Sequence, residues 1–134
     1  MNDYIRLSFP VNAAYVSSAR LTASSIANRI RFDIDEIEDI KTAVSEACTY
    51  IIKRLKPSSK SYFEIKFIPG ADEMRVEIIV YEVEPSPTEG EQTLPDEISL
   101  TMIKALVEEF SAAHTGKGQF TITMIKKHTK TSFE

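Results

Sequence analysis

The chain has little cysteine, histidine and glycine, has no tryptophan and contains no long apolar run. Its single cysteine, Cys48, excludes both a disulfide within the chain and a zinc site built from cysteines. No apolar stretch approaches the ~20 residues of a membrane-spanning helix, and the first ten residues lack the apolar core of a secretion signal. We therefore expect a soluble, cytoplasmic protein that does not bind a membrane.

Neither sign of charge strongly predominates, because 16 Lys and Arg residues stand against 20 Asp and Glu residues, for a net charge of −4. A protein that binds nucleic acid regardless of sequence needs a basic face to neutralise phosphates, so we expect no direct binding to nucleic acid. The hydrophobic content of 43% is too high for a disordered chain. The length of 134 residues fits one domain over residues 1–134.

The spacing of apolar residues predicts four strands and three helices. The expected strands are 4–9, 61–68, 74–81 and 120–124, and the expected helices are about 13–31, 33–56 and 98–113. Asp33 and Glu36 have the capping-box spacing at the start of the second helix. The order β-α-α-β-β-α-β predicts an α/β (α+β) two-layer sandwich, with a mixed β-sheet and three helices on one face. Residues 82–95 are expected to form a loop.

Few residues have the chemistry of a nucleophile, a metal site or a phosphate cradle. We expect His114 in the last turn of the third helix, His128 in a solvated tail, and Cys48 as a buried, inert thiol. No glycine-rich phosphate-binding motif occurs, and the glycines at 116 and 118 fit a helix end followed by a turn. Glu46 flanks the apolar stripe of the second helix, where periodicity alone favours a solvated side chain.

The second helix carries a resemblance that changes this interpretation of Glu46. The run from Asp35 to Thr49, DEIEDIKTAVSEACT, closely resembles the second helix of the bacterial anti-sigma-factor serine kinases. That family belongs to the Bergerat-fold, or histidine kinase-like, ATPase superfamily. Weaker similarities lie at 15–16, 19–22, 27–29, 77–80, 106–109 and 120–124. Together with the predicted element order, the resemblance covers nearly the whole chain and implies the histidine kinase-like ATPase fold.

The resemblance implies an ATP site whose first part is a glutamate and an asparagine one helical turn apart. In the family the glutamate is the general base, and the asparagine oxygen helps to hold Mg²⁺. Glu46 matches the glutamate, but Tyr50 stands at the asparagine position. A phenol is a poor magnesium ligand and is too bulky for that place. This departure implies a weakened metal site.

The other parts of the family's ATP site also carry substitutions in this chain that weaken nucleotide binding. Glu82 and Glu84 replace the aspartate and glycine of the adenine-binding Asp-x-Gly motif. Asp96 and Glu97 lie where the family has a glycine-rich phosphate lid, and carboxylates repel phosphate. Thr121 matches the family's threonine near the adenine. These positions imply weak or absent Mg-ATP binding, so that no cofactor is expected unless ATP and Mg²⁺ still bind a recast site.

The resemblance implies one leading function and leaves two alternatives. The first is an anti-sigma-factor-like pseudokinase that binds a sigma factor or an anti-anti-sigma protein as a homodimer. Arg20 matches a partner-contacting arginine of the family, although it fits an ordinary exposed arginine equally well. The second is an active serine/threonine kinase that uses Glu46 to phosphorylate an anti-anti-sigma factor. The third is a scaffold that binds another small ligand in an apolar cavity beside Glu46.

Overall fold

The computed structural model describes residues 3–55, 62–81, 97–116 and 118–129. The strands are β1 (Ile5–Pro10), β2 (Tyr62–Pro69), β3 (Glu73–Tyr81), β4 (Glu109–Gly116) and β5 (Gln119–Lys127). The helices are α1 (Val16–Ala27), α2 (Ile34–Arg54) and α3 (Glu97–Leu106), and a 3-10 turn, η1 (Ala13–Tyr15), precedes α1. None of the described helices is long and apolar enough to cross a membrane.

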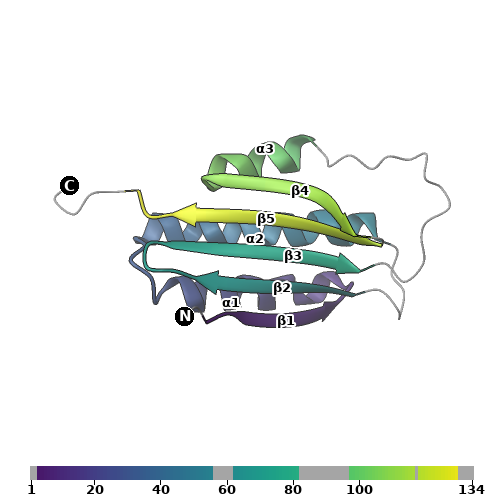
Figure 1. Cartoon of the computed structure of the whole chain (residues 1–134), viewed down its shortest axis with the longest axis horizontal. Helices are drawn as coiled ribbons and strands as arrows, with labels where there is room; N and C mark the ends of the chain where they lie inside the picture. The colour runs from purple at the N-terminus through teal and green to yellow at the C-terminus, as the bar shows by residue number, and fades with distance from the viewer. Residues whose placement is uncertain (1–2, 56–61, 82–96, 117, 130–134) are drawn as a thin grey trace.

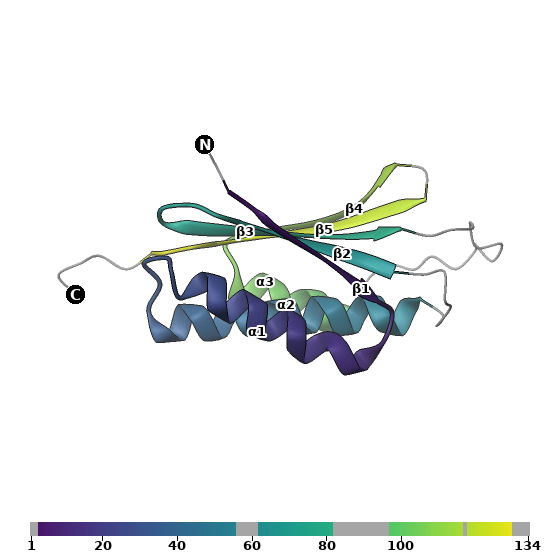
Figure 2. The same cartoon turned by 90° about the horizontal axis from the view of Figure 1, so that it is seen from below.

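The elements form two layers, with the sheet on one side and α1, α2 and α3 together on the other (Figure 2). The predicted two-layer sandwich with three helices on one face is therefore confirmed. The sheet order is β1-β2-β3-β5-β4, and all four neighbouring pairs are antiparallel, so the expected mixed sheet is wrong. The two helices between β1 and β2 run away from the final end of β1 and back to it, so β2 starts there and runs against β1 (Figure 1). The parallel strands β3 and β4 never touch, because β5 lies between them (Figure 1).

The third helix is shorter than predicted, and the residues that follow it form a strand. We expected one helix over 98–113, whereas α3 ends at Leu106 and β4 begins at Glu109. Phe110 continues the helical spacing of α3, and this coincidence hides the change to strand. In β4, Phe110 and Ala112 are half-buried while Ser111 is exposed, which is the alternation of a strand with one covered face. Short apolar runs leave helix and strand ambiguous in this way.

The extra strand also changes the setting of His114. Its ring packs edge-on against Phe120 of β5, with 5.2 Å between the ring centres, so the expected place in a helix end is wrong. The chain then turns back from β4 into β5. Gly118 in this connection has φ of 76°, a left-handed conformation that glycine adopts without strain. The glycine pair therefore belongs to a strand connection and not to a helix end.

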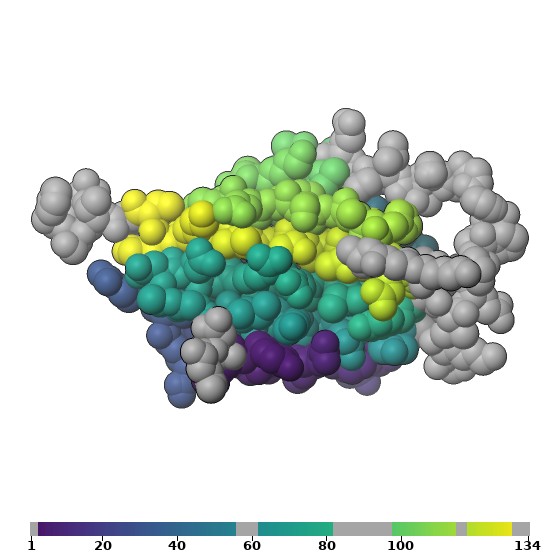
Figure 3. Space-filling view, in the orientation of Figure 1, coloured from purple at the N-terminus to yellow at the C-terminus, as the bar shows by residue number. Residues whose placement is uncertain are grey.

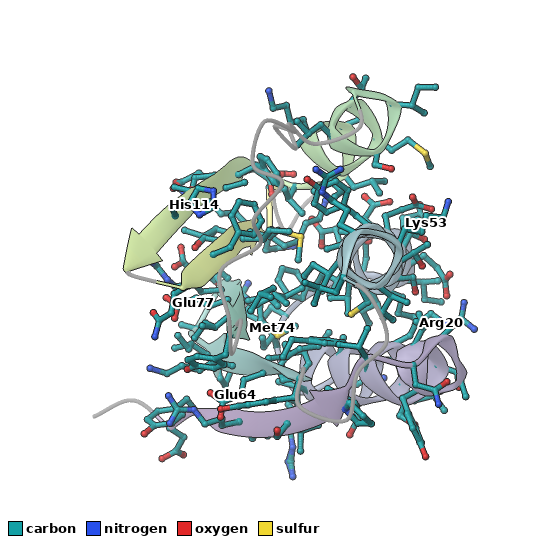
Figure 4. All side chains as sticks on the ribbon, turned by 90° about the vertical axis from the view of Figure 1, so that its right-hand side faces the viewer. Arg20, Lys53, Glu64, Met74, Glu77 and His114 are labelled. Atoms are coloured by element: carbon teal, nitrogen blue, oxygen red, sulfur yellow. The ribbon has the colours of Figure 1, made fainter. Side chains whose placement is uncertain are left out.

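The core lies between the two layers. Alternate residues of β3, from Met74 to Val80, are buried, and they meet the buried face of α2 around Val44 and Ala47. Figure 4 shows Met74 between sheet and helices, with Glu64 and Glu77 on the other side of the sheet. None of the described helices covers that other face, which Figure 3 shows from the front.

The end of β5 is bonded to the beginning of α2. Asp33 caps α2 by accepting the N–H of Glu36 at 2.8 Å, and Glu36 accepts the N–H of Asp33 at 2.9 Å. This confirms the predicted capping box. The Nδ1 atom of His128 lies 2.8 Å from Glu36 Oε1, and the Thr129 N–H donates to Glu36 Oε2 at 3.2 Å. The expectation of a solvated His128 is therefore wrong, because the residues that follow β5 are bonded to the first turn of α2.

Candidate functional site

Glu46 and Tyr50 lie on one face of α2, because residues four apart on a helix are neighbours. Glu46 is half-buried, whereas only 7% of Tyr50 is exposed. The two positions that the family resemblance pairs are therefore brought together, one helical turn apart. The Tyr50 side chain points inward and is part of the core, while Glu46 lies nearer to the surface of the helix.

Tyr50 borders a cavity at the junction of α2, α3, β4 and β5. The centre of a water-sized sphere can occupy about 10 Å³ of this cavity. That is about the minimum space for one water molecule. Most of its lining side chains are apolar, so a water there would have few hydrogen-bond partners. The lining residues are Tyr50, Ser99, Leu100, Ile103, Phe110, Ala112 and Ile122. The third alternative predicts a well-formed apolar cavity beside Glu46, which is not among the residues that line this space, so that alternative stays a prediction.

A cation lies against the ring of Tyr50. The guanidinium carbon of Arg54 is 5.0 Å from the ring centre, within the range of a cation–π contact. Arg54 follows Tyr50 by one helical turn and lies in the last turn of α2. This stack was not predicted from the sequence, although the four-residue spacing of Glu46, Tyr50 and Arg54 along a helix is a signal for it.

Thr121 does not share a face with Glu46 and Tyr50. It pairs across the sheet with Ile79 of β3 and Ala113 of β4, while its neighbour Ile122 is buried under the helices. Successive side chains of a strand point to opposite faces, so Thr121 belongs to the face without helices. The structure therefore separates this predicted site residue from the other two by the thickness of the sheet.

Arg20 lies on the outer side of the helical layer, where its side chain is exposed (Figure 4). Its neighbours Ala19 and Ala23 are buried, which fixes the orientation of α1 and leaves Arg20 outside. An exposed arginine can reach a protein partner. Arg20 is remote from the cavity at Tyr50, since α1 borders neither α3 nor β4 in the structure (Figure 2).

Several predicted site positions lie outside the described residues. Glu82 and Glu84, at the predicted adenine position, and Asp96, at the predicted phosphate position, belong to this set. Glu97 begins α3. The roles of these acids therefore stay predictions, and the site has to be argued from α2, α3 and the described strands.

The pKa values of the other residues that could carry chemistry indicate structural roles. Burial raises the pKa of the Cys48 thiol to about 12, so the predicted inert thiol is supported and a thiolate nucleophile is not. Burial also raises the pKa of Glu36, but the hydrogen bonds from the Asp33 N–H, His128 and the Thr129 N–H outweigh it and lower this pKa below its ordinary 4.5. Among the described residues, no group of three His, Cys, Asp or Glu could hold a metal.

Similar proteins include serine-protein kinases from bacilli. The chain is 42% identical over 78 residues to serine-protein kinase RsbW of Bacillus subtilis (strain 168), covering 58% of this chain and 48% of that protein. Serine-protein kinase RsbW of Bacillus licheniformis is 40% identical over 78 residues, with the same shares of both chains. The chain thus spans about half the length of the curated relatives that it matches. These matches support the resemblance that the second helix suggested.

Fold and family agree with this similarity. A crystal structure of the RsbU and RsbW domains of Rv1364c from Mycobacterium tuberculosis matches with a TM-score of 0.66 and 20% identity, over 93% of this chain and 32% of that chain. At this identity the match establishes the fold alone. Residues 9–126 match the family described as the Histidine kinase-like ATPase domain. The match extends over most of the sequence, so the chain belongs to the histidine kinase-like ATPase domain family.

Proposed function

We propose that the chain is an anti-sigma-factor-like regulator that binds a sigma factor or an anti-anti-sigma protein, and that its ATP binding is impaired. The observation that carries the second part is the Tyr50 side chain, which is only 7% exposed at the position of the family's magnesium-binding asparagine. The similarity to serine-protein kinase RsbW supports the first part. Partner binding without phosphorylation is the function that fits both.

The described part of the site does not fit Mg-ATP. Glu46 is the one predicted site carboxylate whose side chain the structure describes, the cavity at Tyr50 is mostly apolar, and the rings of Tyr50 and Phe110 are among the groups that border this space. A magnesium ion with a triphosphate needs several oxygen ligands and polar donors. We therefore assign no step of a reaction to Glu46 in the leading proposal. The Tyr50 ring fills space that a ligand would need.

An active serine/threonine kinase is the second candidate. It is favoured by Glu46, which keeps the residue type and helical position of the family's general base and is half-buried one turn before Tyr50. The names of the relatives point the same way, since both are serine-protein kinases. For this candidate to hold, the space that Tyr50 borders must widen before a nucleotide can enter.

Thermal unfolding with and without millimolar Mg-ATP or Mg-ADP separates the two candidates. A ligand at 100 times its dissociation constant stabilises the folded state by ~2.7 kcal/mol, which raises the melting temperature of a domain of this size by several degrees. We expect no rise for the natural chain. A rise of several degrees would contradict impaired binding and favour the kinase. The Tyr50→Asn variant, compared with itself without nucleotide, tests whether this single ring blocks the site.

Partner capture tests the regulatory part separately. We expect the Arg20→Ala variant to bind an immobilised sigma factor or anti-anti-sigma protein at least tenfold more weakly than the natural chain. Arg29→Ala is the matched control, because Arg29 is also exposed and follows the end of α1. Both variants should melt within about 1–2 °C of the natural chain, as exposed substitutions usually do. Equal capture by the two variants would contradict a role for Arg20.

A further inference from the structure

The start of α2 is held at two points by residues at the end of β5 and just after it (Figure 2). Lys126 is only 8% exposed, and its Nζ atom donates to Asp39 Oδ2 at 3.0 Å. The Nδ1 atom of His128 lies 2.8 Å from Oε1 of Glu36, which is 4% exposed. A spacing of two residues on an extended segment, or of three on a helix, keeps side chains on one side of the element. The two contacts therefore join one face of α2 to the end of one strand.

The carboxylate of Glu36 also belongs to the cap of α2. Its Oε1 atom, which lies against His128, accepts the Asp33 N–H at 2.9 Å, and Asp33 Oδ1 accepts the Glu36 N–H at 2.8 Å. Its Oε2 atom accepts the Thr129 N–H at 3.2 Å. One carboxylate thus receives groups from the start of α2 and from the chain after β5. A rotation of this carboxylate changes its bonds to both segments at once.

The chain after β5 is also bonded to the turn between β2 and β3. The His128 N–H donates to the Asp72 carbonyl at 2.8 Å, and the Asp72 carboxylate lies 3.8 Å from Arg31 Nη1, in the turn before α2. The Arg31 pair is exposed, so it contributes little. His128 is therefore bonded by its backbone to the hairpin turn and by its ring to α2.

The burial of Glu36 makes its bonds depend on one another. A buried carboxylate is stable as a charge only while hydrogen-bond donors surround it, because burial removes its water. Burial raises the pKa of Glu36, but hydrogen bonds from the Asp33 N–H, His128 and the Thr129 N–H lower it below the ordinary 4.5. A carboxylate that loses two of these three donors turns toward water to recover hydrogen bonds, and its bond to the Asp33 N–H then weakens.

We propose that Glu36 couples the chain after β5 to the start of α2, so that His128 and Thr129 open and close together with the cap of this helix. The device is regulatory, because anything that draws His128 and Thr129 away from α2 also loosens the start of the helix that carries Glu46 and Tyr50. This coupling holds whichever partner the chain binds, so it goes beyond the proposed function. Coupling between two sites is reciprocal, so weakening the cap must in turn loosen His128 and Thr129.

Hydrogen exchange of single backbone amides in the full chain at about pH 7, followed by NMR, tests the coupling in both directions. The His128→Ala variant removes the ring that contacts Glu36 and leaves the sequence of α2 unchanged. We expect the Asp33 and Glu36 amides to exchange at least about fivefold faster than in the natural chain, since coupling between sites is typically worth ~5–150-fold. The Ala14 amide, which donates to Asn12 Oδ1 in the cap of η1, should stay within about twofold.

The Lys127→Ala variant is the matched control, because Lys127 directly precedes His128 and pairs with Glu109 at 2.8 Å. We expect it to leave exchange of the Asp33 and Glu36 amides within about twofold of the natural chain. In the Glu36→Gln background, His128→Ala should also change exchange of the Asp33 amide by less than about twofold, because the shared carboxylate is already gone.

The reverse direction starts from the cap. The Asp33→Ala variant removes the acceptor of the Glu36 N–H, and we expect the His128 and Thr129 amides to exchange at least about fivefold faster. Asn12→Ala is its matched control, because it opens the cap of η1 and leaves α2 unchanged. In that control the same two amides should stay within about twofold of the natural chain.

Faster exchange in both directions, with the Ala14 amide unchanged, supports the coupling. Faster exchange in one direction only or in neither, or an equal acceleration at Ala14, overturns it and leaves His128 and Asp33 as independent stabilising residues. If His128→Ala fails to fold, His128→Phe replaces it, because Phe keeps a ring and lacks the nitrogen that contacts Glu36. The same results then support or contradict the coupling.

Discussion

The two halves of α2 hold their carboxylates in opposite ways. In the first half, Glu36 is 4% exposed, accepts two backbone N–H groups and contacts His128, while Asp39 pairs with Lys126. In the second half, Glu46 is half-buried one turn before Tyr50, which borders an apolar cavity. One half of the helix therefore uses acids to hold elements together, and the other presents an acid at the position where we predict the family's general base.

This difference shows why an acidic residue in a helix cannot be assigned from its type alone. Glu36 and Glu46 are both glutamates in the stretch that resembles the family, separated by ten residues. The first is surrounded by hydrogen-bond donors from separate segments of the chain, whereas the second lies near a space lined by apolar groups. Substitutions in each half should therefore have different effects on stability.

The largest effect is expected from Glu36→Ala. The change removes the acceptor of the Asp33 and Thr129 N–H groups and the partner of His128. Buried donors left without partners cost ~1–3 kcal/mol each, and a lost cap costs ~1 kcal/mol, so we expect a loss of ~3 kcal/mol in the free energy of unfolding. Urea denaturation measures it. The control Glu38→Ala removes an exposed acid that pairs with Lys41, and should change stability by ~0.5 kcal/mol or less.

Acid should remove the same contribution. The pKa of Glu36 is lowered in the folded chain, so its ionised form stabilises folding above the unfolded pKa of 4.5, and this stabilisation is lost as pH falls through the folded value. We expect the Glu36→Gln variant to be ~1.5 kcal/mol less stable than the natural chain at about pH 7. That difference should shrink steadily once the pH falls below the unfolded pKa. A difference that stays constant from about pH 7 to about pH 3 would show that the charge of Glu36 contributes nothing.

Much of the first half of α2 could be predicted from the sequence, because its signals are local. Asp33 and Glu36 are three residues apart, so the capping box follows from spacing alone. The contacts of Glu36 with His128 and of Asp39 with Lys126 join residues about 90 positions apart. No local sequence pattern predicts such contacts. The sequence alone therefore predicts His128 in a solvated tail, and only the fold shows its contact with Glu36.

The second half of α2 shows a different limit of prediction from sequence. The resemblance identified Glu46 and Tyr50 as a pair, and the helix brings them to one face. Thr121 was matched by its place along the last strand, but the face of a strand residue depends on register. Its pairing with Ile79 and Ala113 puts it on the face without helices. A shift of one residue reverses the face, so sequence similarity in a short strand cannot fix it.

A smaller effect is expected from the cation over Tyr50. The Arg54→Ala change removes a contact of 5.0 Å between the guanidinium and the ring, worth ~0.5–1 kcal/mol at an exposed site. Lys53→Ala is the control, because Lys53 is exposed in the same last turn and loses the same favourable interaction with the helix dipole. We expect Arg54→Ala to be ~0.5 kcal/mol less stable than Lys53→Ala in urea denaturation. Equal losses would show that the ring contact adds no stability.

The smallest effect is expected from Glu46→Gln. Gln keeps the size of Glu and has a similar helix propensity, and the described contacts of Glu46 include no ion pair, so we expect a change in unfolding free energy within ~0.5 kcal/mol. Urea denaturation beside Glu36→Gln measures both halves of α2 under the same conditions. A loss above ~1 kcal/mol would show that Glu46 holds structure as Glu36 does, and the contrast between the halves would fail. A negligible loss leaves a half-buried acid that folding does not require. Any fall in phosphate transfer or partner binding in this variant would then report on function, because stability would be unchanged.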